Sequence, residues 1–339
     1  MTRIGTLLAL ASALALAGCA PVAAPSGPPA SAIQAPAGSP VARHGALHVA
    51  DGRVADSHGQ PVTLRGMSLF WSQWAPQYYN AQTVAWLASD WKVSAVRAAI
   101  AAEGQDSALT HMDREIAKAA TVIDAAVAQG IYVIVDWHAH RQHPAEAERF
   151  LAELARRYGH LPNVIWEPFN EPLRDNVDWS RDVKPYHERM VATIRAHDPD
   201  NLIVLGSPSW SQDVDMAARD PVPGDNLVYT LHYYAATHKA ELRAKADAAL
   251  AAGLALMITE YGVVEATGNG PVDLASSQEW WDWAERNGVS YLAWSIGDRN
   301  ETSAALQPGA PTWGWGDGQL TPAGRLMRAH LRRAAGLPR

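Results

Sequence analysis

The sequence predicts an α/β fold, a (β/α)8 or TIM barrel with a short N-terminal β-hairpin, and three observations support this prediction. Eight short apolar runs alternate with helix-like stretches between residues 44 and 335. Each run is followed by a connection long enough to cross over to a parallel neighbour. The turn after the first run, Gly66-Met67-Ser68-Leu69-Phe70-Trp71, is aromatic, whereas a doubly wound open sheet, the competing architecture, has a glycine-rich phosphate turn there.

The first residues have the pattern of a secretion signal. Arg3 is followed by an apolar run from Ile4 to Ala17, which is shorter than the roughly twenty residues of a membrane-spanning helix. The run ends in Leu16-Ala17-Gly18-Cys19, which resembles the bacterial lipobox, a signal for cleavage before a cysteine that is then acylated. We therefore expect residues 1–18 to be a lipoprotein signal peptide and Cys19 to carry lipid. An ordinary secretory signal with a chance cysteine is the alternative.

The residues after Cys19 bear on where such a lipoprotein would go. Position 20 is Ala and not Asp, which by resemblance to known sorting signals indicates the outer membrane, facing the cell surface or the periplasm, or release to the outside. Pro21–Pro40 carries neither charge nor aromatic ring, so it cannot build a core. We expect residues 19–43 to form the lipidated cysteine and a Pro/Ala-rich tether, and residues 44–339 to form one folded, catalytic domain.

Turn residues and apolar runs place the elements of this domain. Leu47–Val49 and Val62–Leu64 flank the turn signals Asp51-Gly52 and His58-Gly59, which predicts the hairpin. The strand candidates are 64–68, 94–98, 131–137, 163–167, 202–206, 227–232, 256–260 and 290–294. The helix candidates are 113–129, 145–158, 185–197, 240–251, 274–287 and 321–334, with a weak one at 212–218.

Composition narrows the class of protein. Hydrophobic residues make up 48% of the chain and charged residues 19%, which allows a large core and excludes global disorder. The 28 Lys+Arg against 35 Asp+Glu give a net charge of −7, so there is no basic footprint for nucleic acid. Cys19 is the single cysteine, which excludes an internal disulfide and a cysteine-ligated zinc site. The 14 Trp against 3 Phe suit a surface that stacks on rings.

Polar and aromatic residues follow most of the predicted strands, and in a barrel this is where functional side chains lie. In chain order these strand ends carry Arg97, His138, Asn170-Glu171, His232 with Tyr234, Glu260, and Trp294. Glu171 and Glu260 are the acids best placed to work as a pair. Cleaving a glycosidic bond needs one acid to protonate the leaving oxygen and a second, ionised carboxylate. Arg97 and Tyr234 would donate hydrogen bonds to the ionised one.

This ordered set, with Asn170-Glu171-Pro172 after an apolar strand, resembles glycoside hydrolase family 5, the cellulase family, over about residues 46–335. The resemblance implies a retaining double displacement in which Glu171 is the general acid/base and Glu260 the nucleophile. It also implies that Asn170 binds the sugar 2-hydroxyl and that Arg97 and Tyr234 orient Glu260.

The same resemblance implies that His138 and His232 line the cleavage subsite and that Trp294 forms its floor. Three places depart from the family's pattern, and the mildest is Tyr261 after Glu260, where Trp or Phe is common. The loop after the first strand holds Phe70-Trp71 and Trp74 where related endoglucanases often carry His, and we expect Trp71 and Trp74 to stack on sugar faces. Asp298-Arg299 stands where many relatives have Asn-Lys or Asp-Lys, and Arg299 would take over the contact of that lysine.

A metal site is the other chemical interpretation of the histidines. His138 and His140 at a strand end, with His143, resemble amidohydrolase zinc sites, and His232 and Asp298 could add ligands. Those sites begin at the first strand, so we expect no metal and no cofactor, and we expect His140 and His143 to be ordinary loop histidines. Asp136 and Glu167 are expected to be structural.

The sequence therefore predicts a retaining endo-β-1,4-glucanase, a cellulase that acts on a β-glucan polysaccharide or oligosaccharide and meets the membrane only through its lipid. The predicted separation of the Glu171 and Glu260 carboxyl groups is about 5–5.5 Å. The alternatives are a related β-glycanase, either a mannanase or a mixed-linkage glucanase, and a glycan-binding lipoprotein without catalysis.

Overall fold

The computed structural model describes residue 1, residues 35–175 and residues 177–337. Apart from Met1, the predicted signal peptide lies outside the described residues, as do Cys19 and most of the predicted tether. Among the described residues, no helix combines the length and the apolar character needed to cross a bilayer.

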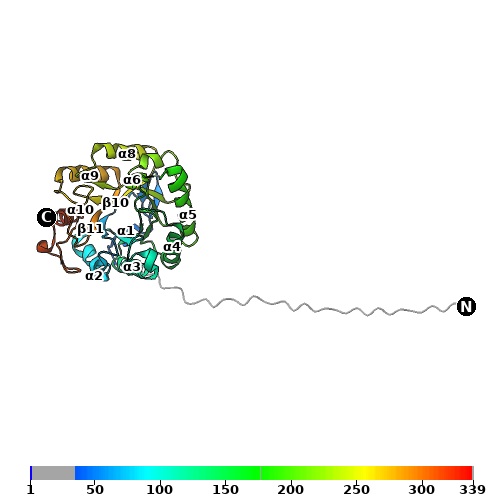
Figure 1. Ribbon diagram of the computed structural model, residues 1–339, viewed down its shortest axis with the longest axis horizontal. Helices are drawn as coiled ribbons and strands as arrows, with labels where there is room; N and C mark the ends of the chain where they lie inside the picture. The colour runs from blue at the N-terminus through cyan, green and yellow to red at the C-terminus, as the bar shows by residue number, and fades with distance from the viewer. Residues whose placement is uncertain (2–34, 176, 338–339) are drawn as a thin grey trace. The chain divides into compact units, whose positions relative to one another are not determined.

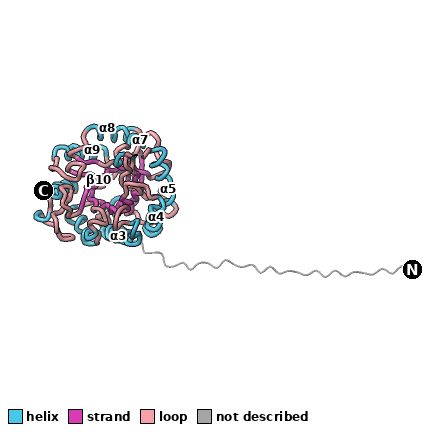
Figure 2. Tube along the Cα trace, viewed as in Figure 1, coloured by secondary structure: helices cyan, strands magenta, loops and turns pink. Residues whose placement is uncertain are grey.

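Eight parallel strands close into a barrel, which confirms the predicted fold class. The strands run in the order β11-β3-β4-β5-β6-β7-β8-β10, and pairing of β10 with β11 closes the ring. Figure 2 shows them as an inner ring with the helices outside. Their bounds are β3 Arg65–Leu69, β4 Ala95–Ala101, β5 Tyr132–His138, β6 Val164–Glu167, β7 Ile203–Leu205, β8 Leu227–Thr230, β10 Leu256–Gly262 and β11 Ser290–Ile296, with a short β9 at Tyr233–Tyr234 beside β10.

The helices surround the barrel (Figure 1) and match the predicted stretches closely, apart from the first and fifth crossovers. The first crossover contains an unpredicted helix, α2, that continues into a π-helical segment, Leu87–Trp91. The fifth has only two four-residue turns, α6 Pro208–Ser211 and α7 Val214–Ala217. The remaining bounds are α2 Ala81–Trp86, α3 Ala108–Gln129, α4 Pro144–Tyr158, α5 Lys184–Arg195, α8 Ala240–Ala251, α9 Leu274–Asn287 and α10 Pro322–Ala334, with shorter segments at Pro76–Tyr78, Trp179–Val183 and Asp317–Gln319.

The N-terminal hairpin is present as β1 His48–Ala50 and β2 Arg53–Ala55, joined through Asp51-Gly52. Its second strand is thus nearer to the turn than the predicted run at 62–64. The packed part of the chain also starts before residue 44, because Pro40–His44 form a helix, α1. Val41 of α1 is buried and its N–H donates to the carbonyl of Gly130 at 2.9 Å. Because Gly130 precedes β5, this contact lies at the amino ends of the strands.

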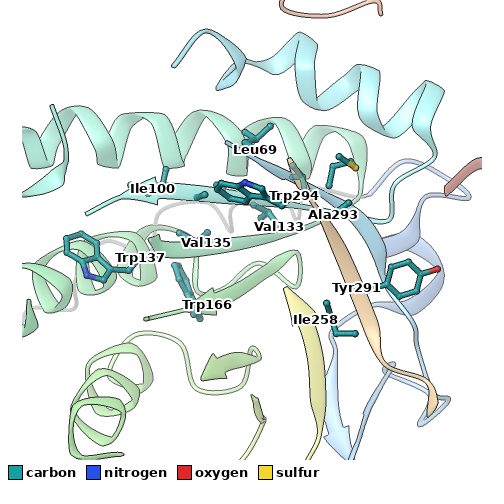
Figure 3. Close-up of a cluster of buried hydrophobic side chains, with 14 of the residues drawn as sticks. Leu69, Ile100, Val133, Val135, Trp137, Trp166, Ile258, Tyr291, Ala293 and Trp294 are labelled. Carbon is teal, nitrogen blue, oxygen red and sulfur yellow. The ribbon is translucent and has the colours of Figure 1, made fainter. Parts of the chain in front are cut away.

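The barrel interior changes from apolar to polar along the strands. Alternate residues of a strand face the same side, and the inward positions near the amino ends form one apolar cluster that includes Ala95, Ile134, Ile165, Val228 and Met257. Two residues further along the same strands stand the buried polar residues Arg97, Asp136, Glu167, Thr230 and Thr259. The intervening residues face outward into the layer under the helices, where Val133, Val135 and Trp166 lie (Figure 3). The two-residue period of the strands thus places a layer of polar side chains next to a layer of apolar side chains inside the barrel.

Gly66 allows β3 and β4 to approach closely. A Cβ atom at this position would lie 2.0 Å from the carbonyl oxygen of Ala95. We predict that Gly66→Ala lowers the free energy of unfolding by at least about 1–3 kcal/mol, the usual cost of overpacking, because the obstacle is backbone. Gly318→Ala is the matched control, since nothing lies within 4 Å of a Cβ there. Urea unfolding measures both, and equal loss in the two variants would contradict the prediction.

Candidate active site

A cleft of about 490 Å³ opens at the carboxyl ends of the strands. It is lined by His140, Glu171, Trp210, Gln212, His232, Tyr234, His238, Glu260 and Ala266. Four of these were predicted from the sequence to lie in the site: Glu171, His232, Tyr234 and Glu260. The cleft adjoins the polar layer of the barrel.

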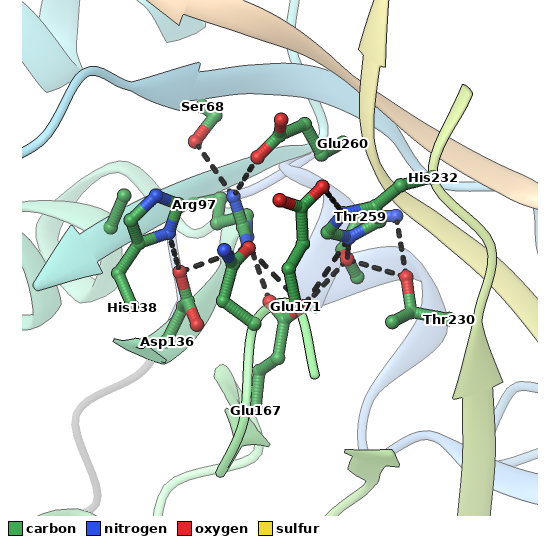
Figure 4. A network of polar contacts seen from close by, with 12 residues as sticks. Ser68, Arg97, Asp136, His138, Glu167, Glu171, Thr230, His232, Thr259 and Glu260 are labelled. Carbon is green, nitrogen blue, oxygen red and sulfur yellow. Dashed lines mark hydrogen bonds and ion pairs between the residues drawn. The ribbon is translucent and has the colours of Figure 1, made fainter. Parts of the chain in front are cut away.

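The guanidinium of Arg97 is the centre of the polar layer. Arg97 lies on β4 with no exposed surface. Its Nε donates to Glu167 Oε2 at 2.7 Å, its Nη1 to Glu260 Oε2 at 3.1 Å, and its Nη2 lies 2.9 Å from Asp136 Oδ2 (Figure 4). Burial lowers the pKa of Arg97. The charges of Asp136, Glu167 and Glu260 raise this pKa by more than burial lowers it, so the guanidinium stays charged.

Glu260 is turned into the site by a β-bulge. In the pairing of β10 with β11, Ile258 lies opposite Tyr291 and Tyr261 opposite Ala293, so two residues of β10 face one of β11. As a result Thr259 and Glu260 both reach the interior polar network. Tyr234 donates its hydroxyl to Glu260 Oε1 at 2.9 Å, and Arg97 donates to the other oxygen. Both oxygens of Glu260 are therefore held by donors.

Glu171 faces Glu260 from the loop after β6. One carboxylate oxygen of Glu171, one of Glu260 and one ring nitrogen of His232 lie within 4.8 Å of one another. His232 Nδ1 lies 2.9 Å from Glu171 Oε1, and His140 Nε2 lies 3.2 Å from Oε2. At least one oxygen of each carboxylate is therefore within 4.8 Å of the other, close enough for the two acids to flank a single glycosidic bond.

The hydrogen bonds decide where the protons reside. Burial raises the pKa of Glu171, but the hydrogen bonds of His140 and His232 outweigh it and lower this pKa to about 2. Burial lowers the pKa of His232, but Glu167 and Glu171 raise it to about 9. Burial and the nearby charge of Glu171 raise the pKa of Glu260 from its usual value. At neutral pH the cleft therefore contains ionised Glu171 and a protonated His232.

Asn170 and His138 are fixed by the same network. Arg97 Nη2 donates to Asn170 Oδ1 at 2.6 Å, while Asn170 Nδ2 is buried and has no partner among the described residues. His138 Nδ1 lies 2.6 Å from Asp136 Oδ2, and its ring stacks on Trp294 at 5.2 Å and 4°. Burial, followed by the charge of Arg97, keeps the pKa of His138 well below its usual value, so this imidazole is neutral.

Tryptophans from the loops after β3 and β7 lie near the site. Trp71 makes an edge contact with His138 at 4.1 Å and lies 5.1 Å from Trp74, which is 49% exposed. Trp210 is 45% exposed and lines the cleft from α6. Ser209, Trp210 and Ser211 all have left-handed φ angles, between 57° and 59°, a strained conformation for such residues that is typical of functional sites. Arg299 is exposed, and in the described part of the chain no contact joins its guanidinium to the two acids.

The histidines considered for a zinc site do not converge. His138 pairs with Asp136, His140 with Glu171, and His143 Nε2 lies 3.2 Å from Glu103. Among the described residues, the one cluster of metal-binding groups is that of Glu171, His232 and Glu260. We do not assign it as a metal site, because both Glu260 oxygens accept from Arg97 and Tyr234, and His232 Nδ1 is used on Glu171.

Five residues of the cleft lining were not predicted from the sequence: His140, Trp210, Gln212, His238 and Ala266. Trp210 follows the fifth strand and is one of the loop tryptophans that suit sugar stacking, but the sequence alone does not distinguish it from a core residue. Its position in the loop after a barrel strand was the available signal. The sequence predicts His140 to be an ordinary loop histidine, because it does not show that Glu171, thirty-one positions away, lies opposite it.

Comparison with known proteins identifies the family. Residues 55–300 match the family model described as cellulase, glycosyl hydrolase family 5. Endoglucanase Z of Dickeya dadantii is 45% identical over 275 residues, 80% of this chain and 62% of that protein. Endoglucanase N of Pectobacterium atrosepticum is 40% identical over 309 residues, 88% of this chain and 68% of that protein. The chain thus spans less than two thirds of the length of Endoglucanase Z.

Solved structures agree with these relatives. A structure from Cytophaga hutchinsonii superimposes with a TM-score of 0.86 at 45% identity, covering 88% of this chain and 98% of that one. The catalytic domain of Thermobifida fusca endoglucanase Cel5A, solved in complex with cellotetraose, gives a TM-score of 0.82 at 30% identity, covering 87% of this chain and 100% of that one. The chain therefore belongs to glycoside hydrolase family 5, the cellulase family.

Proposed function

We propose that this protein is a retaining endo-β-1,4-glucanase that hydrolyses internal bonds of a β-glucan. The observation that carries the proposal is the pair of Glu171 and Glu260, which face each other across a cleft within 4.8 Å. The names of the relatives, endoglucanases Z and N, and the cellotetraose bound to the Thermobifida fusca domain favour a glucan over a mannan.

In this proposal Glu260 is the nucleophile. Its carboxylate attacks the anomeric carbon, and the bond to the leaving oxygen breaks as Glu171 supplies a proton to that oxygen. Water then attacks the glycosyl-enzyme, and Glu171 takes the proton of that water. The donors Arg97 and Tyr234 stay on the Glu260 oxygens and hold the carboxylate ionised and oriented.

The remaining polar and aromatic groups bind the sugar. Asn170 is held through its carbonyl oxygen, so its unpartnered Nδ2 is free to donate to the sugar 2-hydroxyl. Trp294 and His138 form a stacked floor under the reacting ring. Exposed Trp74 and Trp210 offer apolar faces to neighbouring sugars on either side.

Amide substitutions test the pair. We predict that Glu171→Gln loses roughly 10²–10⁴-fold of the activity on carboxymethylcellulose, the usual contribution of a general acid, and that Glu260→Gln loses at least as much. Circular dichroism and thermal unfolding are expected to show that both variants stay folded. Reducing-sugar release measures the activity, and wild-type rates in either variant would contradict the assignment.

Added azide separates the two roles. Glu171→Ala with azide should release β-glycosyl azide, because azide attacks the glycosyl-enzyme from the face that water uses. Glu260→Ala with azide should release the α product, because azide then takes the place of the nucleophile. Nuclear magnetic resonance identifies the anomers. Release of the same anomer by both variants would show that the two acids do not have different roles.

We further propose that Cys19 anchors the enzyme to the outer membrane by lipid. The lipobox-like Leu16-Ala17-Gly18-Cys19 supports this.

Metabolic labelling tests the anchor. We predict that the wild type incorporates radioactive palmitate and partitions into detergent, whereas Cys19→Ser does neither, because only a thiol takes the thioether lipid. Ser26→Ala, in the same tether, is the control and should label fully. An unlabelled wild type would indicate an ordinary secretory signal.

A further inference from the structure

A second imidazole lies on the proposed acid/base. His140 Nε2 is 3.2 Å from Glu171 Oε2, on the oxygen that His232 does not use. His140 comes from the loop after β5 and His232 from the chain between β8 and β9. Glu171 is therefore held by two histidines from different segments, one on each of its oxygens.

The two histidines differ in their access to water. The side chain of His140 is 30% exposed and that of His232 is 1% exposed. His232 is also bonded through both nitrogens, because Nε2 lies 3.0 Å from Thr259 Oγ1, whose hydroxyl donates to Glu167. Both N–H groups of His232 are thus engaged, one on Glu171 and one on Thr259. His140, in contrast, can exchange its proton with solvent.

The loop that carries His140 is clamped. Glu103 Oε1 accepts the backbone N–H of His140 at 3.1 Å and that of Arg141 at 2.6 Å. On the cleft side the imidazole packs on Trp71, with ring centroids 5.4 Å apart and 34° between the planes. Backbone clamp and ring contact together aim Nε2 at Glu171.

The charges around His140 favour its protonated form. Glu171 faces it from the loop after β6, Glu103 from the loop after β4, and Glu260 from β10, while the neutral His138 ring lies 6.4 Å away. Burial lowers the pKa of His140, but the hydrogen bond and charge of Glu171, followed by the charges of Glu103 and Glu260, raise it above its usual value. Among the described residues, the ion pairs of Glu171 are those with His140 and with the fixed His232.

We propose that His140 stores the proton that Glu171 delivers to the leaving oxygen, and so acts as a proton-holding, positioning residue for the acid/base. This inference rests on the proposed glycosidase function. It accounts for how a carboxylate that is ionised in the empty cleft can act as an acid: the proton is one hydrogen bond away.

The proton transfers balance over a turnover. The N–H bond at His140 Nε2 breaks and an O–H bond forms on Glu171, which leaves a neutral imidazole. Glu171 passes this proton to the glycosidic oxygen, which departs as an alcohol, and becomes a carboxylate again. In the second half-reaction Glu171 takes a proton from the attacking water and returns it to His140 Nε2. Water is the only co-reactant.

His140→Gln tests the proposal, because Gln can still donate a hydrogen bond to Glu171 but cannot hold the proton. We expect the alkaline limb of the kcat/KM profile on cellotetraose to move down by about one pH unit or more. With 2,4-dinitrophenyl cellobioside, whose leaving group needs no protonation, we expect kcat/KM to change less than about twofold. A residue that only supported the loop would affect both substrates alike.

His143→Gln is the matched control. His143 lies on the same loop, is 26% exposed, and also faces Glu103, but it does not contact Glu171. The pH profile of kcat/KM of the His143→Gln variant should superimpose on that of the wild type. Superposition of the His140→Gln profile on the wild type would overturn the proposal, and so would equal losses on the two substrates.

A measurement on the unmutated enzyme covers the case in which His140→Gln unfolds. Titration of the His140 ring nitrogens by nuclear magnetic resonance should give a pKa that coincides with the alkaline limb, and a mismatch of more than about one unit would overturn the proposal. Failure of the proposed function has a different signature, because the wild type itself would then not cleave cellotetraose.

Discussion

The structure of the active site depends on one buried cation, the guanidinium of Arg97. Its removal from water is costly, and the contacts with Asp136, Glu167 and Glu260 offset that cost only while all of them are in place. The planar fork of arginine reaches several oxygens at once, which a lysine ammonium would do less well. Because Arg97 stands between the apolar interior and the cleft, the orientation of Glu260 is tied to the packing of the barrel itself.

A second constraint is the bulge in β10. Strict alternation would place Met257 and Thr259 inside the barrel and turn Glu260 toward the helices. The extra residue opposite β11 lets Thr259 bond Glu167 while Glu260 bonds Arg97. The same strand thus completes both the buried polar layer and the wall of the cleft.

The sequence predicted the strands well because each is an apolar run between turn signals, and the strand ends placed the main polar residues on one face. It did not predict α1 and α2, because helices of 5 and 6 residues are too short to show an apolar period, although Ser39 and Asn80 cap their first turns. The bulge in β10 and the meeting of His140 with Glu171 are also invisible in the sequence, because both arise from the register and loop paths of neighbouring strands. The types of residue could be predicted, but their hydrogen-bond partners could not.

The charges of the site explain why a proton stored on His140 would suit the reaction. In the proposed reaction Glu260 enters the first chemical step as a carboxylate and His140 enters it as an imidazolium. The same polar cluster therefore contains one negative and one positive charge that the step can remove together. When Glu260 bonds to the sugar it loses its negative charge, and when the stored proton leaves with the alcohol His140 loses its positive charge. The net charge of the cluster is therefore the same before and after the first chemical step, which spares a site of low dielectric constant the cost of an unbalanced charge.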